Sequence, residues 1–263
     1  MKRLYILIII FFLSGCNEQG SIPAKNHESS IQLKNTVQKQ IQNRDGREKI
    51  RIWPFIKDVP SEQDEGVADN LLTKNYLLIF DGSGSMNKVE CSGGKKKIDV
   101  AKESVVKWAK IVPENANLGL VAFHNNGWIF RPLIAGQKQD FIRKIHAVTA
   151  GDKTPLSDAF QYAFKDLTRQ ARRQLGYGEY TIVVVTDGIA NNEKRLKILV
   201  DSILRNSSIN IDSIGFCIGE NHSLNQPGRT IYKAANNPAE LQYGLEEVLA
   251  ESETFDDSKF NDQ

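Results

Sequence analysis

The sequence has few cysteines, little net charge and no long apolar run. Its 3 cysteines among 263 residues are too few for a disulfide-based scaffold. The 34 lysines and arginines nearly balance 32 aspartates and glutamates, and a formal net charge of +2 provides no basic footprint for nucleic acid. With 19 glycines and 8 prolines, collagen-like and low-complexity chains are also excluded. The 40% of residues that are hydrophobic suffice for a core in one large domain or two small ones.

The chain begins with a pattern typical of export. Lys2 and Arg3 precede an apolar run over residues 4–13, which is shorter than the roughly 20 residues that span a bilayer core. The run ends in Leu-Ser-Gly-Cys at Cys16, which resembles a bacterial lipobox, whose cysteine receives a diacylglycerol. We therefore predict a lipoprotein signal peptide over residues 1–15 and lipidation of Cys16; an ordinary secretory signal with a chance cysteine is the alternative. Asn17 resembles the residue that follows the cysteine in outer-membrane lipoproteins, so we expect a lipid-anchored protein of the bacterial cell envelope, in the outer membrane.

The segment after the signal peptide is polar. Residues 16–72 are dominated by Gln, Asn, Ser, Glu and Lys, a composition that argues against a packed core. We predict a tether or linker over this range; the alternative is that the residues around Trp53-Pro54 form a strand or a patch docking on the main domain. The main domain is predicted over residues 73–252, and residues 253–263 form a polar C-terminal tail.

Strand-like and helix-like patterns alternate along the main domain. Apolar runs at residues 76–80, 118–123, 181–185 and 209–216 are typical of strands buried on both faces of a parallel sheet. Apolar stripes at helical spacing run from Ile98 to Ala109, from Leu156 to Leu167 and from Leu196 to Ile203, and residues 238–250 predict a closing helix. The predicted fold class is therefore α/β, with a doubly wound, mostly parallel central sheet flanked by helices. Residues 127–133 are a candidate antiparallel edge.

Polar side chains follow the predicted strands where ligands bind in such sheets. The first strand leads directly into Asp81-Gly-Ser83-Gly-Ser85, and the strand at 181–185 leads into Thr-Asp187-Gly. Thr154 stands at the entrance of a predicted helix between them. Two carboxylates and three hydroxyls make an all-oxygen set, which suits hard divalent ions such as Mg²⁺.

These residues resemble a known family. D-x-S-x-S after the first strand, Thr in G-x-x-T-P-L and Asp in V-T-D-G are similar to the von Willebrand factor A domain over about residues 75–252. The resemblance implies a metal-ion-dependent adhesion site, with Ser83, Ser85 and Thr154 holding Mg²⁺ (or Mn²⁺ or Ca²⁺) through hydroxyls and Asp81 and Asp187 mostly through water. It also implies that a protein partner completes the metal shell with an acidic residue.

Two other features lie near the same rim. Cys91 follows the loop that carries Ser83 and Ser85, and Cys217 ends a predicted strand. An oxidising compartment therefore favours a Cys91–Cys217 disulfide; two independent cysteines are the alternative. Lys95, Lys96 and Lys97 precede a helix whose dipole opposes them. We interpret this triplet as a solvated loop, with attraction of acidic partners as the alternative.

The leading functional hypothesis is a non-enzymatic, metal-dependent protein-binding lipoprotein. The principal alternative is a phosphotransferase of the haloacid-dehalogenase type, which also places Asp after its first strand but carries a second Asp where this chain has Ser83. A scaffold with a vestigial metal site is a further alternative. Partners are expected to include the membrane, through Cys16, but no nucleic acid, and the sequence leaves the oligomeric state open.

Overall fold

The computed structural model describes residues 53–54, 66–125 and 127–252. The predicted signal peptide, Cys16, most of the segment 16–72 and the tail 253–263 lie outside the described residues. Within the described ranges, no helix is both long and apolar enough to cross a bilayer.

The centre of the domain is a six-stranded sheet in the order β3-β2-β1-β4-β5-β6. The strands are β1 (Lys74–Asp81), β2 (Asn117–His124), β3 (Gly127–Ala135), β4 (Glu179–Thr186), β5 (Ile209–Phe216) and β6 (Ile231–Ala235). All neighbouring pairs are parallel except β2–β3, which is antiparallel. The predicted doubly wound, mostly parallel sheet is confirmed, and so is its antiparallel edge.

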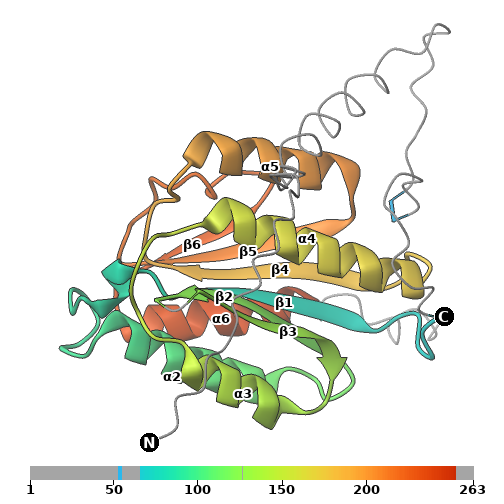
Figure 1. Cartoon of the computed structure of the whole chain (residues 1–263), viewed down its shortest axis with the longest axis horizontal. Helices are drawn as coiled ribbons and strands as arrows, with labels where there is room; N and C mark the ends of the chain where they lie inside the picture. The colour runs from blue at the N-terminus through green and yellow to red at the C-terminus, as the bar shows by residue number, and fades with distance from the viewer. Residues whose placement is uncertain (1–52, 55–65, 126, 253–263) are drawn as a thin grey trace, which may run out of the picture. The chain divides into compact units, whose positions relative to one another are not determined.

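Helices cover both faces of this sheet (Figure 1). They are α2 (Lys97–Ile111), α3 (Lys138–Ala147), α4 (Leu156–Arg173), α5 (Glu193–Asn206) and α6 (Pro238–Ser252), with a short 3₁₀ helix η1 (Gly84–Asn87). Helices α4 and α5 lie on one face, and α2, α3 and α6 lie on the other (Figure 1). The three apolar stripes and the pattern at residues 238–250 predict α2, α4, α5 and α6, because each of these helices has a sheet face to cover, whereas α3 was not predicted.

The core is divided by the sheet into two layers, and strand β1 shows why. Tyr76, Leu78 and Phe80 belong to the apolar cluster that includes residues of α2, α3 and α6. Leu77 and Ile79 belong to the cluster that includes residues of α4 and α5. Successive side chains of a strand point to opposite faces, so a continuous apolar run is needed to bury both.

A residue from the predicted tether takes part in this core. Trp53 is buried and donates a hydrogen bond from Nε1 to the Thr168 hydroxyl of α4 at 3.1 Å. Its ring meets that of Tyr180 edge-to-face, with centroids 5.0 Å apart. Arg172 also donates to the carbonyl oxygen of Pro54 at 3.2 Å. The prediction of a tether is therefore wrong for Trp53-Pro54, which dock on the main domain as the alternative has it.

Candidate metal site

The two predicted carboxylates lie at the same edge of the sheet. Asp81 is the last residue of β1, and Asp187 follows Thr186, the last residue of β4. Strands β1 and β4 are parallel neighbours, with Phe80 opposite Val185. Their carboxyl ends therefore deliver both carboxylates to one place, where ligands of open α/β sheets bind.

The loop after β1 is shaped by close backbone packing. Gly82 donates to the carbonyl oxygen of Phe123 at 2.9 Å, and a Cβ on Gly82 would lie 2.6 Å from that oxygen. Only glycine fits there without displacing β2. The loop that carries Thr154 is joined to the same turn, because Gly151 donates to the carbonyl oxygen of Gly82 at 2.9 Å and Gly84 donates to that of Asp152 at 3.0 Å.

Four of the five predicted residues form one hydrogen-bonded chain. Asp81 Oδ1 accepts from the backbone N–H of Ser83 at 2.7 Å, and the hydroxyls of Ser83 and Ser85 are 3.0 Å apart. Ser85 Oγ donates to Asp187 Oδ1 at 2.6 Å. The side chains of Asp81, Ser83 and Asp187 are buried. The spacing of residues along the chain therefore becomes a continuous set of oxygens in space.

Thr154 lies close to this set, beside Gly188. A Cβ built on Gly188 would lie 3.4 Å from Ser85 Oγ and 3.5 Å from Thr154 Oγ1, so both hydroxyls face the space that such a methyl group would enter. Thr154 is buried, and its backbone N–H donates to Asn191 Oδ1 at 3.1 Å. We call the five residues Asp81, Ser83, Ser85, Thr154 and Asp187 the oxygen site.

The oxygen site is short of positive charge. Burial raises the pKa of Asp81 to about 6, and the nearby Asp187 carboxylate adds to the rise, whereas hydrogen bonds from Thr186 and Ser83 oppose it. Lys97 contributes one ammonium, whose Nζ lies 3.0 Å from Asp187 Oδ2. Two ionised carboxylates against one ammonium leave an excess negative charge in a buried place, which a cation would relieve.

The composition of the oxygen site matches a hard divalent ion. Its donors are carboxylate and hydroxyl oxygens, and Mg²⁺ prefers oxygen ligands and retains several waters. The ammonium of Lys97 donates to Asp187, so this carboxylate already stabilises one cation. The described residues hold no cluster of three or more His, Cys, Asp or Glu able to bind a metal, and the remaining oxygens of this site are hydroxyls.

Residues 76–189 match the sequence model of the von Willebrand factor type A domain, a range that includes the whole oxygen site. This part of the chain is a von Willebrand factor type A domain.

Two curated relatives of this chain are uncharacterized proteins. YwmD of Bacillus subtilis is 44% identical over 68 residues, covering 26% of this chain and 28% of YwmD. A protein of Borreliella burgdorferi is 28% identical over 153 residues, covering 57% of this chain and 42% of the relative. The chain therefore spans less than half the length of either relative.

Solved structures share the fold. A von Willebrand factor type A domain from Catenulispora acidiphila has a TM-score of 0.55 at 18% identity, covering 69% of this chain and 43% of that one. The pilus adhesin SpaC from Lactobacillus rhamnosus GG has a TM-score of 0.55 at 12% identity, covering 71% of this chain and 31% of SpaC. Manganese-loaded TRAP from Plasmodium vivax has a TM-score of 0.51 at 19% identity, covering 67% of this chain and 73% of the TRAP chain. At these identities, the likeness shows the fold alone.

Three residues that support the site of this von Willebrand factor A domain were not predicted. Thr186 donates from its hydroxyl to Asp81 Oδ2 at 2.5 Å, and Lys97 pairs with Asp187. His222 is buried, and its Nδ1 accepts from the N–H of Leu224 at 3.2 Å. The hydrogen of the neutral ring is therefore on Nε2, 3.1 Å from the carbonyl oxygen of Gly188. Burial lowers the pKa of His222, whereas the hydrogen bond to Gly188 and the nearby Glu193 carboxylate oppose the fall. The bond from Nε2 to Gly188 joins the His222 loop to the turn that carries Asp187.

The predicted cysteine pair lies near the same edge of the domain. The structure joins Cys91 to Cys217, directly after β5, in a disulfide whose Cα atoms are 6.1 Å apart. The prediction of a fully solvated lysine triplet is wrong for Lys97, which is buried. It fits the first lysine, because Lys95 is exposed and pairs with Glu103 at 2.8 Å.

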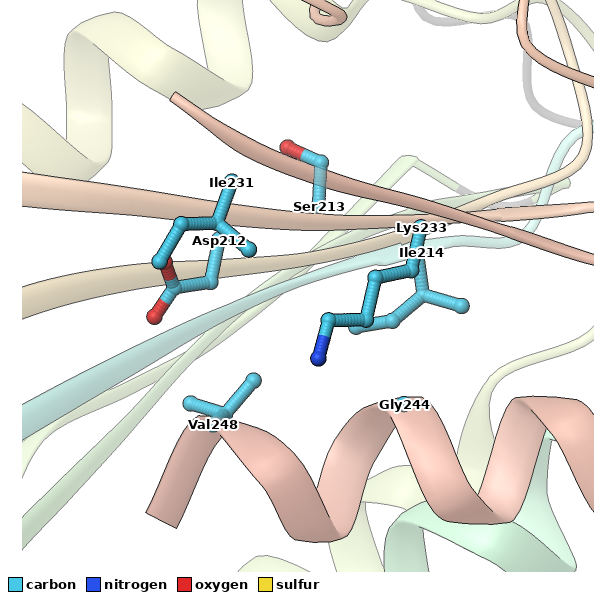
Figure 2. Close-up of a pocket in the computed structure, with 7 residues that line it drawn as sticks. All are labelled: Asp212, Ser213, Ile214, Ile231, Lys233, Gly244 and Val248. Carbon is cyan, nitrogen blue, oxygen red and sulfur yellow. The ribbon is translucent and has the colours of Figure 1, made fainter. Parts of the chain in front are cut away.

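A cleft elsewhere in the domain offers no comparable chemistry. It lies between β5, β6 and α6, where Asp212 and Lys233 extend toward α6 with Ile214 and Val248 close by (Figure 2). Lys233 forms an ion pair with Glu247. The oxygen site at the strand ends therefore remains the better candidate for ligand binding.

Proposed function

We propose that this chain is a lipid-anchored protein of the bacterial cell envelope whose domain binds a protein partner through a divalent ion. Asp81, Ser83, Ser85, Thr154 and Asp187 would hold the ion. The observation that carries the proposal is the hydrogen-bonded set of buried oxygens at the ends of β1 and β4 with its excess negative charge.

The donor set favours binding over catalysis. A hydroxyl transfers less negative charge to a cation than a directly bound carboxylate does, so an ion held largely by Ser83, Ser85 and Thr154 keeps much of its positive charge. Such an ion attracts a carboxylate, and an acidic side chain of a partner protein is the ligand that it would capture. Binding of the partner then depends on the metal.

The comparisons support this proposal in outline. One neighbour in fold is a pilus adhesin and another is a manganese-loaded protein. A binding role at the cell surface or envelope and a divalent ion such as Mg²⁺ or Mn²⁺ are consistent with both. The apolar run at residues 4–13 and Cys16 support the lipid anchor.

The alternative of an aspartate-nucleophile phosphotransferase is disfavoured by the surroundings of Asp81. Both carboxylate oxygens already accept hydrogen bonds, from Ser83 and Thr186, and the side chain is buried. These two hydrogen bonds stabilise the carboxylate and lower its nucleophilicity. In addition, the hydroxyl of Ser83 stands where that family has a carboxylic acid, and it is a poor proton donor at neutral pH.

Metal titration tests the proposal directly. The full chain in detergent micelles is titrated with Mn²⁺, and free Mn²⁺ is measured by electron paramagnetic resonance, with Mg²⁺ added as competitor. We expect one site that Ser83→Ala weakens at least tenfold. Ser213→Ala is the matched control, because Ser213 is a buried serine of β5 outside the oxygen site. Equal Mn²⁺ binding by all three proteins would refute the proposed site.

The lipid anchor has its own test. The N-terminal peptide of the protein isolated from membranes should begin at Cys16 and carry the mass of a diacylglycerol. Cys16→Ser should move the protein from the membrane fraction to the soluble fraction. A membrane-bound Cys16→Ser variant would refute lipid anchoring while leaving the metal site untouched.

A further inference from the structure

One buried cation faces the oxygen site. Lys97 Nζ donates to Asp187 Oδ2 at 3.0 Å, and the exposed fractions of the two side chains are only 6% and 0%. A lysine is almost never buried unless it is paired. The ion pair therefore belongs to the interior of the site.

The position of Lys97 is an unfavourable one for a cation. It is the first residue of α2, where the helix dipole repels positive charge. The backbone N–H of Lys97 donates to the carbonyl oxygen of Lys88 at 2.8 Å, which holds the helix start beside the metal loop. Its neighbours Lys95 and Lys96 are exposed. The ion pair with Asp187 therefore holds the Lys97 ammonium at the start of α2, although the dipole of the helix repels a positive charge there.

Asp187 has both oxygens engaged in this arrangement. Oδ1 accepts from Ser85 Oγ at 2.6 Å, and Oδ2 accepts from Lys97. We propose that Lys97 is a tethered competitor of the divalent ion: its ammonium neutralises Asp187 when no metal is bound and lowers the affinity of the site for metal. This inference rests on the proposed function, because it concerns the same site.

A second carboxylate can receive the displaced ammonium. Glu90 Oε2 lies 4.0 Å from Lys97 Nζ, and the Glu90 side chain is 65% exposed. The next residue, Cys91, is joined to Cys217, and Cys217 Sγ contacts the carbonyl oxygen of Glu90 at 3.2 Å. The disulfide therefore keeps Glu90 near Lys97. Metal binding would exchange the pair Lys97–Asp187 for the pair Lys97–Glu90 without leaving the ammonium unpaired.

The test compares neutral replacements of Lys97 with a matched lysine. Lys97→Met removes the charge and keeps a long, unbranched side chain. Lys97→Gln removes the charge, but its side chain can still donate a hydrogen bond to Asp187. Lys96→Met makes the same change of charge one residue away on an exposed side chain. Mn²⁺ affinity of each full chain is measured by electron paramagnetic resonance, and the melting temperature is measured in EDTA and in Mg²⁺.

We expect Lys97→Met and Lys97→Gln to bind Mn²⁺ at least tenfold more tightly than wild type, with Lys96→Met within about twofold. Their melting temperatures should be lower than that of wild type in EDTA and should rise more on adding Mg²⁺. Binding by the Lys97 variants alone would also support the inference. If wild type binds Mn²⁺ and the Lys97 variants bind it equally or more weakly, Lys97 supports the metal and the inference is wrong. If no protein binds Mn²⁺, the proposed function itself fails, and the inference fails with it.

Discussion

The buried carboxylate of Asp81 makes the stability of the metal-free protein depend on pH. Its pKa is 3.8 in an unfolded chain and about 6 in the folded protein. The folded state therefore favours the protonated form of Asp81. The stability that this proton provides is fully present below pH 3.8 and is lost as the pH rises through about 6. A difference of about two pH units, at about 1.4 kcal/mol each, corresponds to about 3 kcal/mol.

Asp81→Asn isolates this effect from other titrating groups. The amide is neutral at every pH, can accept from Ser83 N–H through Oδ1 and can donate to the Thr186 hydroxyl through Nδ2. In EDTA, the free energy of unfolding of Asp81→Asn minus that of wild type should grow by about 2 kcal/mol between pH 4 and pH 7, since part of the full effect is already lost at pH 4. Urea denaturation followed by tryptophan fluorescence measures both values.

A bound metal ion should reverse the sign of this dependence of stability on pH. Because the ion binds ionised Asp81, its apparent affinity should fall by about tenfold per pH unit below pH 6, and Mg²⁺ at pH 7 should stabilise wild type but not Asp81→Asn. Asp69→Asn, at an exposed aspartate, should keep the pH profile of wild type. A difference between Asp81→Asn and wild type that stays constant from pH 4 to pH 7 would show that the Asp81 carboxylate is not perturbed as described.

Three further predictions concern other parts of the domain. Trp53→Ala should lower the free energy of unfolding by about 3–5 kcal/mol in urea, because it empties a buried site; a change under about 1 kcal/mol would mean that Trp53 does not pack there in solution. Gly188→Ala should lower Mn²⁺ affinity at least tenfold and change stability by about 1 kcal/mol or less, since its methyl group meets the Ser85 hydroxyl and the hydroxyl and methyl groups of Thr154 at 3.4–3.8 Å, which is ordinary contact distance; unchanged affinity would contradict the position of the site. Reduction of the Cys91–Cys217 disulfide, which links residues 126 apart, should cost about 5 kcal/mol of stability in the chain-entropy model. A double Cys→Ser variant should not respond to the reductant.

The sequence predicts most of the fold because most elements bury many apolar side chains. The elements that the sequence does not predict bury few apolar side chains. Helix α3 has only Phe141 and Ile145 as buried residues, and β6 has only Ala235 buried, whereas its Ile231 is exposed. An edge strand or a short helix at the sheet margin needs little apolar surface, so its pattern does not rise above that of a loop.

The same reasoning explains what the sequence shows of the oxygen site. Asp81 and Asp187 directly follow apolar strand runs, so their positions at the sheet edge can be predicted. Lys97 carried a usable signal: the helical stripe through Ala101 and Val105 extends back by one turn to Lys97, on the buried face. His222 had none, because its bond to Gly188 joins two loops whose approach is decided by tertiary packing.

The charges of the site connect metal affinity with the choice of partner. With Asp81, Asp187 and Glu90 ionised against Lys97, these groups carry a net charge of −2, and a divalent ion brings it to zero. Glu90 is 65% exposed, so water screens its charge more than that of the ammonium, and the loaded site keeps a positive field for an acidic side chain of a partner. This gives a physical reason for a site that weakens its own metal binding. Without the ammonium, the field is less positive and attracts a carboxylate less. Mn²⁺-saturated Lys97→Met should therefore bind an acidic peptide more weakly than Mn²⁺-saturated wild type in calorimetry, although it binds the metal more tightly. Equal peptide affinities would mean that the Lys97 ammonium does not contribute to the field at the partner's carboxylate.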